Sequence, residues 1–227
     1  MEHDFWHNRW QNKQIGFHLP EANPLLVKHF SALDLTPKTP QKVNKTQQTK
    51  PRVFVPLCGK TLDIAWLLAQ GCRVVGIELS QIAIDALFAE LGMTPNITPL
   101  GDLTLYQAQH LDVFVGDIFK LNAEMLGQVN AVYDRAALVA LPASMRKAYA
   151  AHLLAISQCA PQLLICFEYD PTLHAGPPFC VPADEVREHY AASHDLTLLA
   201  TEKVDGGLKG VCPAVEQVWH LAPKRAF

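Results

Sequence analysis

Short apolar runs rich in β-branched residues alternate along this chain with segments whose apolar residues repeat at helical spacing. The runs cover residues 52–56, 72–77, 112–115, 130–133 and 163–167. After the first run, Leu62, Ala65, Trp66 and Ala69 share one helical face, and further helices are expected between residues 80 and 92, over 143–157 and over 182–193. Polar residues are nearly absent from the runs, which is typical of parallel strands buried on both faces. The chain is therefore expected to be an α/β protein with a mainly parallel sheet.

Two later runs, 196–202 and 215–221, predict an antiparallel pair at one edge of the sheet, so about seven strands are expected. With 227 residues, 49% of them hydrophobic, the chain can bury a core of its own as one domain over residues 1–227. Within it we expect an N-terminal helical cover over 1–35 and an α/β core over 52–227. The segment 36–51 carries four lysines, no acids and one large apolar residue, which predicts a flexible loop.

Charge and composition exclude several classes of function. The 19 basic and 22 acidic residues give a formal charge of −3, which argues against a nucleic-acid partner. No apolar run approaches the roughly 20 residues that span a bilayer, and the polar N-terminus is unlike a signal peptide. The six cysteines form no C-x-x-C pair, so we expect buried thiols, no metal site and a cytoplasmic location.

Polar residues follow directly after the predicted parallel strands. They are Cys58-Gly59-Lys60, Glu78, Asp117, Asp134-Arg135 and Glu168-Tyr169-Asp170. Ligands of open α/β sheets bind at the carboxyl ends of the strands, near the point where strand order reverses. A candidate site is therefore expected where these residues meet.

Glu78 and the loop around Gly59 indicate which ligand this site takes. A carboxylate 19 residues beyond the first-loop glycine can accept hydrogen bonds from both hydroxyls of a ribose. The loop has one glycine where G-x-G-x-x-G needs three, which disfavours a pyrophosphate and favours an adenosine such as that of S-adenosylmethionine. Asp117 can approach the adenine. Alternatively, Glu78 only helps to cap the helix that follows Ser80.

Several stretches carry a resemblance to a known family. They are FWHNRWQNKQIGFH, RVFVPLCGKTLDIAWLLAQG, VVGIELS, GDIF, VYDRAALVAL, YDPTLHAGPPF and VPADEV, in order through most of the chain. The sequence resembles the thiopurine S-methyltransferase family, most closely its bacterial members. The resemblance implies a class I methyltransferase fold, a Rossmann-like three-layer sandwich with an N-terminal helical cover, which uses S-adenosylmethionine and releases S-adenosylhomocysteine.

The resemblance also carries over site residues. It implies cofactor contacts at Trp10, Leu57, Glu78, Arg135, Asp117 and Ile118, the last two on the adenine side. It implies a substrate pocket walled by Phe17, Arg135, Pro177, Pro178 and Phe179. The chain departs from the family in its longer, more polar 36–51 loop. It also departs in segment 204–213, which lacks the arginine of vertebrate members and offers only Lys209, a poor geometric substitute.

Arg135 is the expected catalytic residue. If it faces the pocket, its fixed charge favours an anionic nucleophile such as an aromatic thiolate. Alternatively it pairs with Asp134 or Asp117 as scaffolding. Trp6 is expected to pack the N-terminal helix, whereas Trp10 is expected near the sulfonium of the cofactor.

The expected function is methyl transfer to the sulfur of small aromatic or heterocyclic thiols, with selenium and tellurium species as further acceptors. A monomer is expected, with a small molecule as its partner. Two alternatives stay open: a nucleotide-dependent oxidoreductase, which the missing loop glycines disfavour, and a binding module without turnover.

Overall fold

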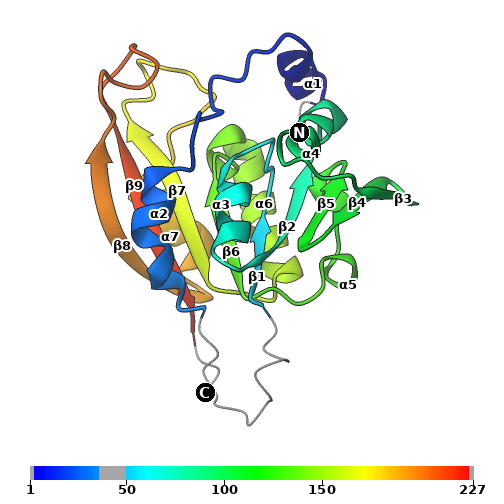
Figure 1. The fold of residues 1–227 in the computed structure, drawn as a ribbon. Helices are drawn as coiled ribbons and strands as arrows, with labels where there is room; N and C mark the ends of the chain where they lie inside the picture. The colour runs from blue at the N-terminus through cyan, green and yellow to red at the C-terminus, as the bar shows by residue number, and fades with distance from the viewer. Residues whose placement is uncertain (1–2, 36–49, 225–227) are drawn as a thin grey trace.

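The computed structural model describes residues 3–35 and 50–224 and contains one nine-stranded sheet (Figure 1). Most of the expected 36–51 loop lies outside the described residues. The strand order is β3-β4-β5-β2-β1-β6-β7-β9-β8. The strands are β1 (Arg52–Val55), β2 (Arg73–Glu78), β3 (Asn96–Leu100), β4 (Leu103–Ala108), β5 (Leu111–Val115), β6 (Ala131–Arg135), β7 (Gln162–Tyr169), β8 (His194–Lys203) and β9 (Ala214–Pro223).

The centre of the sheet is parallel, as the sequence predicts. β1 pairs with β2 on one side, where Val53 lies opposite Val74, and with β6 on the other, where Val53 lies opposite Ala131. β2 continues to β5 and β6 to β7, also in parallel. Strand order therefore reverses beside β1, which makes the carboxyl end of this strand the expected place for a ligand.

Both edges of the sheet are antiparallel. The predicted pair over 196–202 and 215–221 is present as β8 and β9. The expected count of about seven strands was too low, because β3 and β4 form a second antiparallel edge on β5. β3 reads NITPL and is mostly exposed, so it lacks the apolar run that marks a buried strand. Pro99 inside it is tolerated because β3 is an edge strand.

Helices cover both faces of the sheet. α1 (His3–Gln11) lies apart from these faces (Figure 1). The other helices are α2 (Pro24–His29), α3 (Asp63–Ala69), α4 (Gln81–Glu90), α5 (Ala123–Leu126), α6 (Ala143–Ile156) and α7 (Ala183–Tyr190), with 3-10 turns η1 (Phe30–Leu33), η3 (Ile118–Lys120) and η4 (Leu138–Ala140). Alternate residues of β1 point to opposite faces. Val53 and Val55 pack with α2, α3 and α4, whereas Phe54 packs with α5, α6 and α7. The result is the expected three-layer arrangement.

α4 begins directly after Ser80, as predicted, but the hydroxyl of Ser80 does not cap it. In the part of the chain that the structure describes, no helix is long and apolar enough to cross a bilayer. The carboxyl ends of the parallel strands lie at the top of Figure 1. α1, the loop after β7 and the β8–β9 turn gather above this edge from distant parts of the sequence.

Candidate active site

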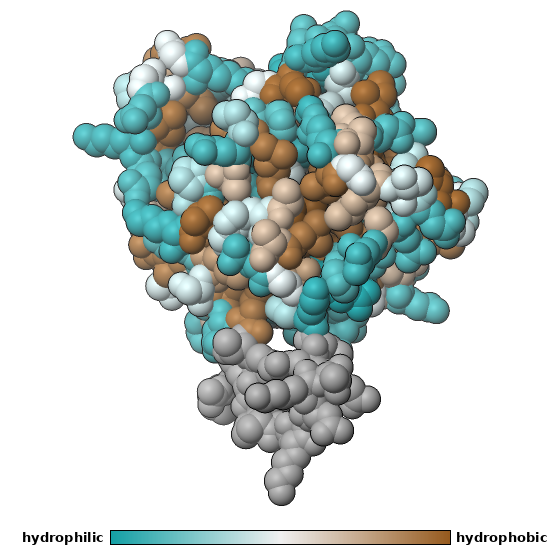
Figure 2. All heavy atoms as spheres, in the orientation of Figure 1, coloured by the Kyte–Doolittle hydropathy of each residue, from teal (hydrophilic) through white to brown (hydrophobic). Residues whose placement is uncertain are grey.

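A cavity of ≈ 500 Å³ lies at the carboxyl ends of β1, β2 and β6. Figure 2 shows a recess between the two projections at the top of the molecule. We call one part of the lining the loop wall: Leu57, Cys58, Gly59, Lys60, Glu78 and Leu79. We call another part the outer wall: Trp6, Phe17, Pro177, Pro178, Leu208, Lys209 and Glu216. Trp10 and Arg135 also line the cavity.

The loop wall is shaped by the turn between β1 and α3. Leu57 and Gly59 both have positive φ, 45° and 52°, and the N–H of Cys58 donates to the carbonyl of Ile77 at 2.9 Å. A Cβ on Gly59 would lie 3.0 Å from the ring of Trp10. Glycine is therefore needed here twice, for the left-handed backbone and for the close approach of the indole.

Glu78 ends β2 and is 6% exposed. Its Oε2 accepts a hydrogen bond from the N–H of Gly59 at 2.8 Å, and its Oε1 accepts one from the N–H of Ser80 at 2.9 Å. Burial raises the pKa of the Glu78 carboxyl, and these backbone donors oppose the rise. A carboxylate offers about four acceptor positions, so Glu78 can anchor the loop and still accept hydrogen bonds from a ligand.

Three aromatic side chains of the N-terminal segment stand together over the loop wall. The rings of Trp10 and Phe17 are 5.6 Å apart, and those of Trp6 and Phe17 are 5.8 Å apart, both edge to face. Trp10 is buried, whereas Trp6 and Phe17 are half-buried. Phe17 therefore joins the two tryptophans, and all three face the cavity.

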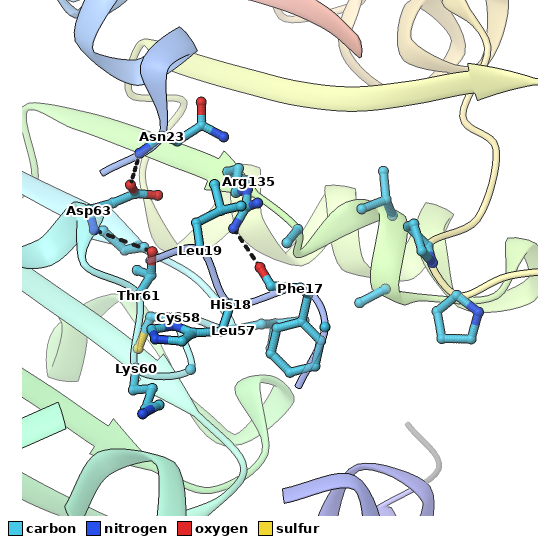
Figure 3. A pocket seen from close by; sticks show the side chains of 18 of the residues that line it. Phe17, His18, Leu19, Asn23, Leu57, Cys58, Lys60, Thr61, Asp63 and Arg135 are labelled. Atoms are coloured by element: carbon cyan, nitrogen blue, oxygen red, sulfur yellow. Dashed lines mark hydrogen bonds between the residues drawn. The ribbon is translucent and has the colours of Figure 1, made fainter. Parts of the chain in front are cut away.

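Arg135 ends β6 and faces the cavity (Figure 3). Its Nη1 donates to the carbonyl of Phe17 at 3.0 Å, which ties the N-terminal segment to the sheet. Asp134 does not pair with it: this carboxylate accepts hydrogen bonds from the Tyr149 hydroxyl at 2.7 Å and the Leu138 N–H at 3.1 Å. Asp134 is fully buried, and burial raises its pKa to about 6.

Three of the residues expected at the site are absent from the cavity lining: Asp117, Ile118 and Phe179. The Asp117 carboxylate accepts from the N–H of Phe119 at 3.0 Å, and the Ile118 side chain is fully buried in the core. Phe179 packs against Gly176, where a Cβ would lie 2.4 Å from its ring. The other expected residues, Trp10, Phe17, Leu57, Glu78, Arg135, Pro177 and Pro178, all line the cavity.

Sequence reasoning missed a buried polar cluster beside the loop wall. The Asp63 carboxylate accepts a hydrogen bond from the Asn23 N–H at 2.7 Å (Figure 3). It accepts a second one from the Tyr133 hydroxyl at 3.0 Å. Burial, the largest cause, and the charge of Asp63 raise the pKa of Tyr133 well above its ordinary range, whereas the charge of Arg135 opposes the rise. Asp63 opens α3, where a first-turn acid looks like an ordinary helix-dipole residue, so nothing in the sequence marks it.

His18 also lines the cavity and was not singled out from the sequence. Burial lowers the pKa of its imidazole, and the nearby charges of Lys60 and Arg135 lower it further, whereas Glu90 and Asp63 oppose them. Lys60 itself is paired with Glu90. The ring therefore favours its neutral form beside the loop wall.

Lys209 takes a different part from the one its sequence position suggested. Its Nζ donates to the carbonyl of Pro177 at 2.5 Å, so it joins the β8–β9 turn to the proline wall. Burial lowers the pKa of its ammonium group, and the charge of Arg9 adds to this. Two segments of the outer wall, the β8–β9 turn and the loop after β7, are thus linked by the side chain of Lys209.

Comparisons with known proteins agree with this architecture. A family model described as thiopurine S-methyltransferase matches residues 1–221. A thiopurine S-methyltransferase of Xanthobacter autotrophicus is 56% identical over 97% of this chain and 99% of that protein. A thiopurine S-methyltransferase of Teredinibacter turnerae is 46% identical over 98% of both chains.

Two solved structures that resemble this one are described as methyltransferases. A Burkholderia thailandensis 1,6-didemethyltoxoflavin-N1-methyltransferase, with S-adenosylhomocysteine bound, aligns with a TM-score of 0.61 at 15% identity, over 97% of this chain and 87% of that one. An S-adenosylmethionine-dependent methyltransferase of Anabaena variabilis aligns with a TM-score of 0.56 at 15% identity, over 96% and 94%. These likenesses support the fold. On its sequence relatives, the chain belongs to the thiopurine S-methyltransferase family of S-adenosylmethionine-dependent methyltransferases.

Proposed function

We propose that this methyltransferase acts on the sulfur of small aromatic and heterocyclic thiols, thiopurines among them, and on related selenium and tellurium nucleophiles. One observation carries the proposal. A single cavity brings the buried carboxylate of Glu78 together with the fixed charge of Arg135 beneath an aromatic and proline-rich wall. Its volume of ≈ 500 Å³ lies within the range of sites that enclose small molecules.

The loop wall is assigned to the methyl donor. When bound, S-adenosylmethionine supplies an electrophilic methyl group on a sulfonium. The Glu78 carboxylate has acceptor capacity beyond its bonds to Gly59 and Ser80, which the ribose hydroxyls can use. Leu57 and Trp10 line the same cavity as Glu78. An indole ring attracts a nearby sulfonium by roughly 0.5–2 kcal/mol.

The adenine is assigned to the side of β5. The N–H of Gly116 donates to the carbonyl of Glu78 at 2.9 Å, so the two residues that follow lie next to the ribose position. Asp117 and Ile118 do not reach the cavity with their side chains. We therefore assign the contact with the adenine to the main chain of Asp117 and Ile118 and not to their side chains.

The outer wall and Arg135 are assigned to the acceptor. The guanidinium of Arg135 carries a positive charge into the cavity, so it stabilises a thiolate beside the methyl donor. Phe17, Pro177 and Pro178 exclude water and hold a flat ring in line with the transferred methyl group. Phe179 supports this wall from behind, through its N–H bonded to the carbonyl of Val139 at 2.7 Å.

We also propose that the protein is a monomer located in the cytoplasm. All six cysteines are free thiols in the structure, which suits a reducing compartment. Sedimentation of the purified chain at several concentrations tests the monomer, and a concentration-dependent mass would contradict it.

The proposal is tested in two steps. Calorimetric titration with S-adenosylhomocysteine should give saturable binding, whereas NAD should give none. Turnover with S-adenosylmethionine is then measured for thiophenol, a thiopurine and, as oxygen and nitrogen counterparts, phenol and aniline. We expect methylation of the two sulfur acceptors only. A folded protein that binds S-adenosylhomocysteine but methylates neither sulfur acceptor would contradict the proposed acceptor class.

A further inference from the structure

Glu216 is a carboxylate in the outer wall that the proposed reaction has not yet used. It lies on β9, opposite Phe167 of β7, and both residues line the cavity. This part of β9 adjoins the carboxyl end of β7, the edge of the sheet at which the cavity opens. The side chain of Glu216 is half-buried and makes no hydrogen bond or ion pair with any residue in the described ranges.

An unpaired carboxylate is unusual in such surroundings. The residues around it in the outer wall are mostly apolar, and polar groups in such places normally find a partner. Two charges act on it from neighbouring strands: Arg135 of β6 attracts it, and Glu202 of β8 repels it. Burial, the largest influence, raises the pKa of Glu216, and Glu202 adds to this, whereas Arg135 opposes it. Glu216 is therefore suited to accept a hydrogen bond or a proton from a ligand in the cavity.

The chemistry of heterocyclic thiols supplies such a donor. A thiol next to a ring nitrogen exists largely as its thione tautomer, in which the proton is on nitrogen and the sulfur is doubly bonded to carbon. Methylation at sulfur then requires loss of the N–H proton. An arene thiol such as thiophenol has no ring N–H and loses its proton from sulfur. The two acceptor types therefore need a base at different positions.

We propose that Glu216 is a catalytic and specificity-determining residue that accepts the ring N–H proton of thione-type heterocyclic acceptors. The N–H bond breaks and its proton goes to a carboxylate oxygen of Glu216. The electron pair of that bond forms the ring C=N bond, and the C=S π pair moves to sulfur, which forms the new bond to the methyl carbon. The methyl–sulfonium bond breaks and leaves its pair on the donor sulfur. Arg135 stabilises the charge on the acceptor sulfur. This inference rests on the proposed function.

Two acceptors distinguish this role from general packing. Pyridine-2-thione carries the ring N–H, whereas 4-nitrothiophenol is already a thiolate at pH 7.5. We expect Glu216→Gln to lower kcat/KM for pyridine-2-thione by about 100-fold and to change kcat/KM for 4-nitrothiophenol less than about threefold. In the wild type, kcat/KM for the thione should fall as the pH drops through the raised pKa of Glu216. In Glu216→Gln this decrease at low pH should be absent.

The matched control is Glu188→Gln. Glu188 is exposed on α7 and does not line the cavity, so its substitution makes the same chemical change away from the acceptor and from Glu216. The control substitution should change kcat/KM for either acceptor by less than about twofold. Equal losses with both acceptors in Glu216→Gln, or no loss with either, would overturn the proposal.

A binding measurement stands apart from turnover. Wild-type protein saturated with S-adenosylhomocysteine is titrated with pyridine-2-thione and with N-methylpyridine-2-thione, which lacks the N–H. We expect the N–H form to bind at least tenfold more tightly in the wild type and about equally in Glu216→Gln. Equal affinities in the wild type would refute the role of Glu216. If this preference is present while wild-type turnover fails, the proposed function falls and the hydrogen bond to Glu216 stands.

Discussion

The loop wall and the outer wall of the cavity are built in different ways. The loop wall comes from two adjacent strand ends, and its key carboxylate, Glu78, is fixed by two main-chain N–H groups. The outer wall is assembled from the N-terminal segment, the loop after β7 and the β8–β9 region, held by single bonds such as that from Lys209 to Pro177. One wall is therefore preorganised by the backbone, and the other depends on side chains that link separate segments.

This difference has a functional consequence. A common methyl donor needs one fixed arrangement, which a strand-end loop supplies. Acceptors vary in shape and charge, and segments held by few contacts can change without disturbing the sheet. Substitutions in the loop wall should therefore affect donor binding, and those in the outer wall should affect the acceptor.

The largest effect is expected from Glu78→Gln. The amide can present only one acceptor oxygen, and its NH₂ faces a backbone donor, either Gly59 or Ser80. Because hydrogen bonds to a charged group contribute about 1.5–3 kcal/mol, we expect the Kd for S-adenosylhomocysteine to rise about 100-fold by calorimetry. Glu124→Gln on the exposed side of α5 is the control and should change the Kd less than twofold. An unchanged Kd in Glu78→Gln would show that this carboxylate does not bind the ribose.

A smaller effect is expected from Gly59→Ala, with Gly92→Ala as its partner. Both glycines have positive φ, 52° and 64°, but a Cβ on Gly59 meets the Trp10 ring at 3.0 Å and one on Gly92 meets nothing within 4 Å. Both variants should lose about 1 kcal/mol in free energy of unfolding from backbone strain. Only Gly59→Ala should weaken S-adenosylhomocysteine binding, by about tenfold, because it displaces Trp10. Equal Kd values for the two variants would show that Trp10 takes no part in donor binding.

Asp134 lies next to Arg135 but belongs to neither wall, so it offers a test of the scaffold alone. Its folded pKa of about 6 lies above its ordinary value of 3.8, so the folded state holds more protons between these values. The free energy of unfolding should therefore gain about 1 kcal/mol from this group as the pH falls from 7 to 5. Urea unfolding of wild type and Asp134→Asn at both pH values measures it. The difference between the two proteins should change with pH by that amount, and a constant difference would rule out the raised pKa.

The sequence predicts the fold well where burial is two-sided. The parallel strands carry uninterrupted apolar runs because helices cover both faces, and all five predicted runs are strands of the sheet. β3 escaped notice because an exposed edge strand needs no such run, and NITPL has none. Edge strands depend on their neighbour for pairing, which local composition does not record.

The two walls also differ in how far the sequence predicts their residues. Leu57, Gly59 and Glu78 follow predicted strands directly, so counting from strand ends was enough to place them together. Asp63 and Glu216 reach the cavity only through the packing of α3 and the register of β9 on β7, which no local pattern encodes. Arg135 was placed by its strand, but its bond to the Phe17 carbonyl joins residues 118 apart.

The smallest effect is expected from Lys209→Met, which tests how far the outer wall depends on one bond between segments. Methionine keeps the length of the side chain but cannot donate to the Pro177 carbonyl, so the proline loop should lose one tether. We expect KM for 4-nitrothiophenol to rise about threefold, while the Kd for S-adenosylhomocysteine stays within twofold. Lys203→Met, an exposed lysine on β8, is the control and should change neither value. A larger change in Kd than in KM would mean that the two walls act as one unit, because a tether confined to the outer wall acts on the acceptor alone.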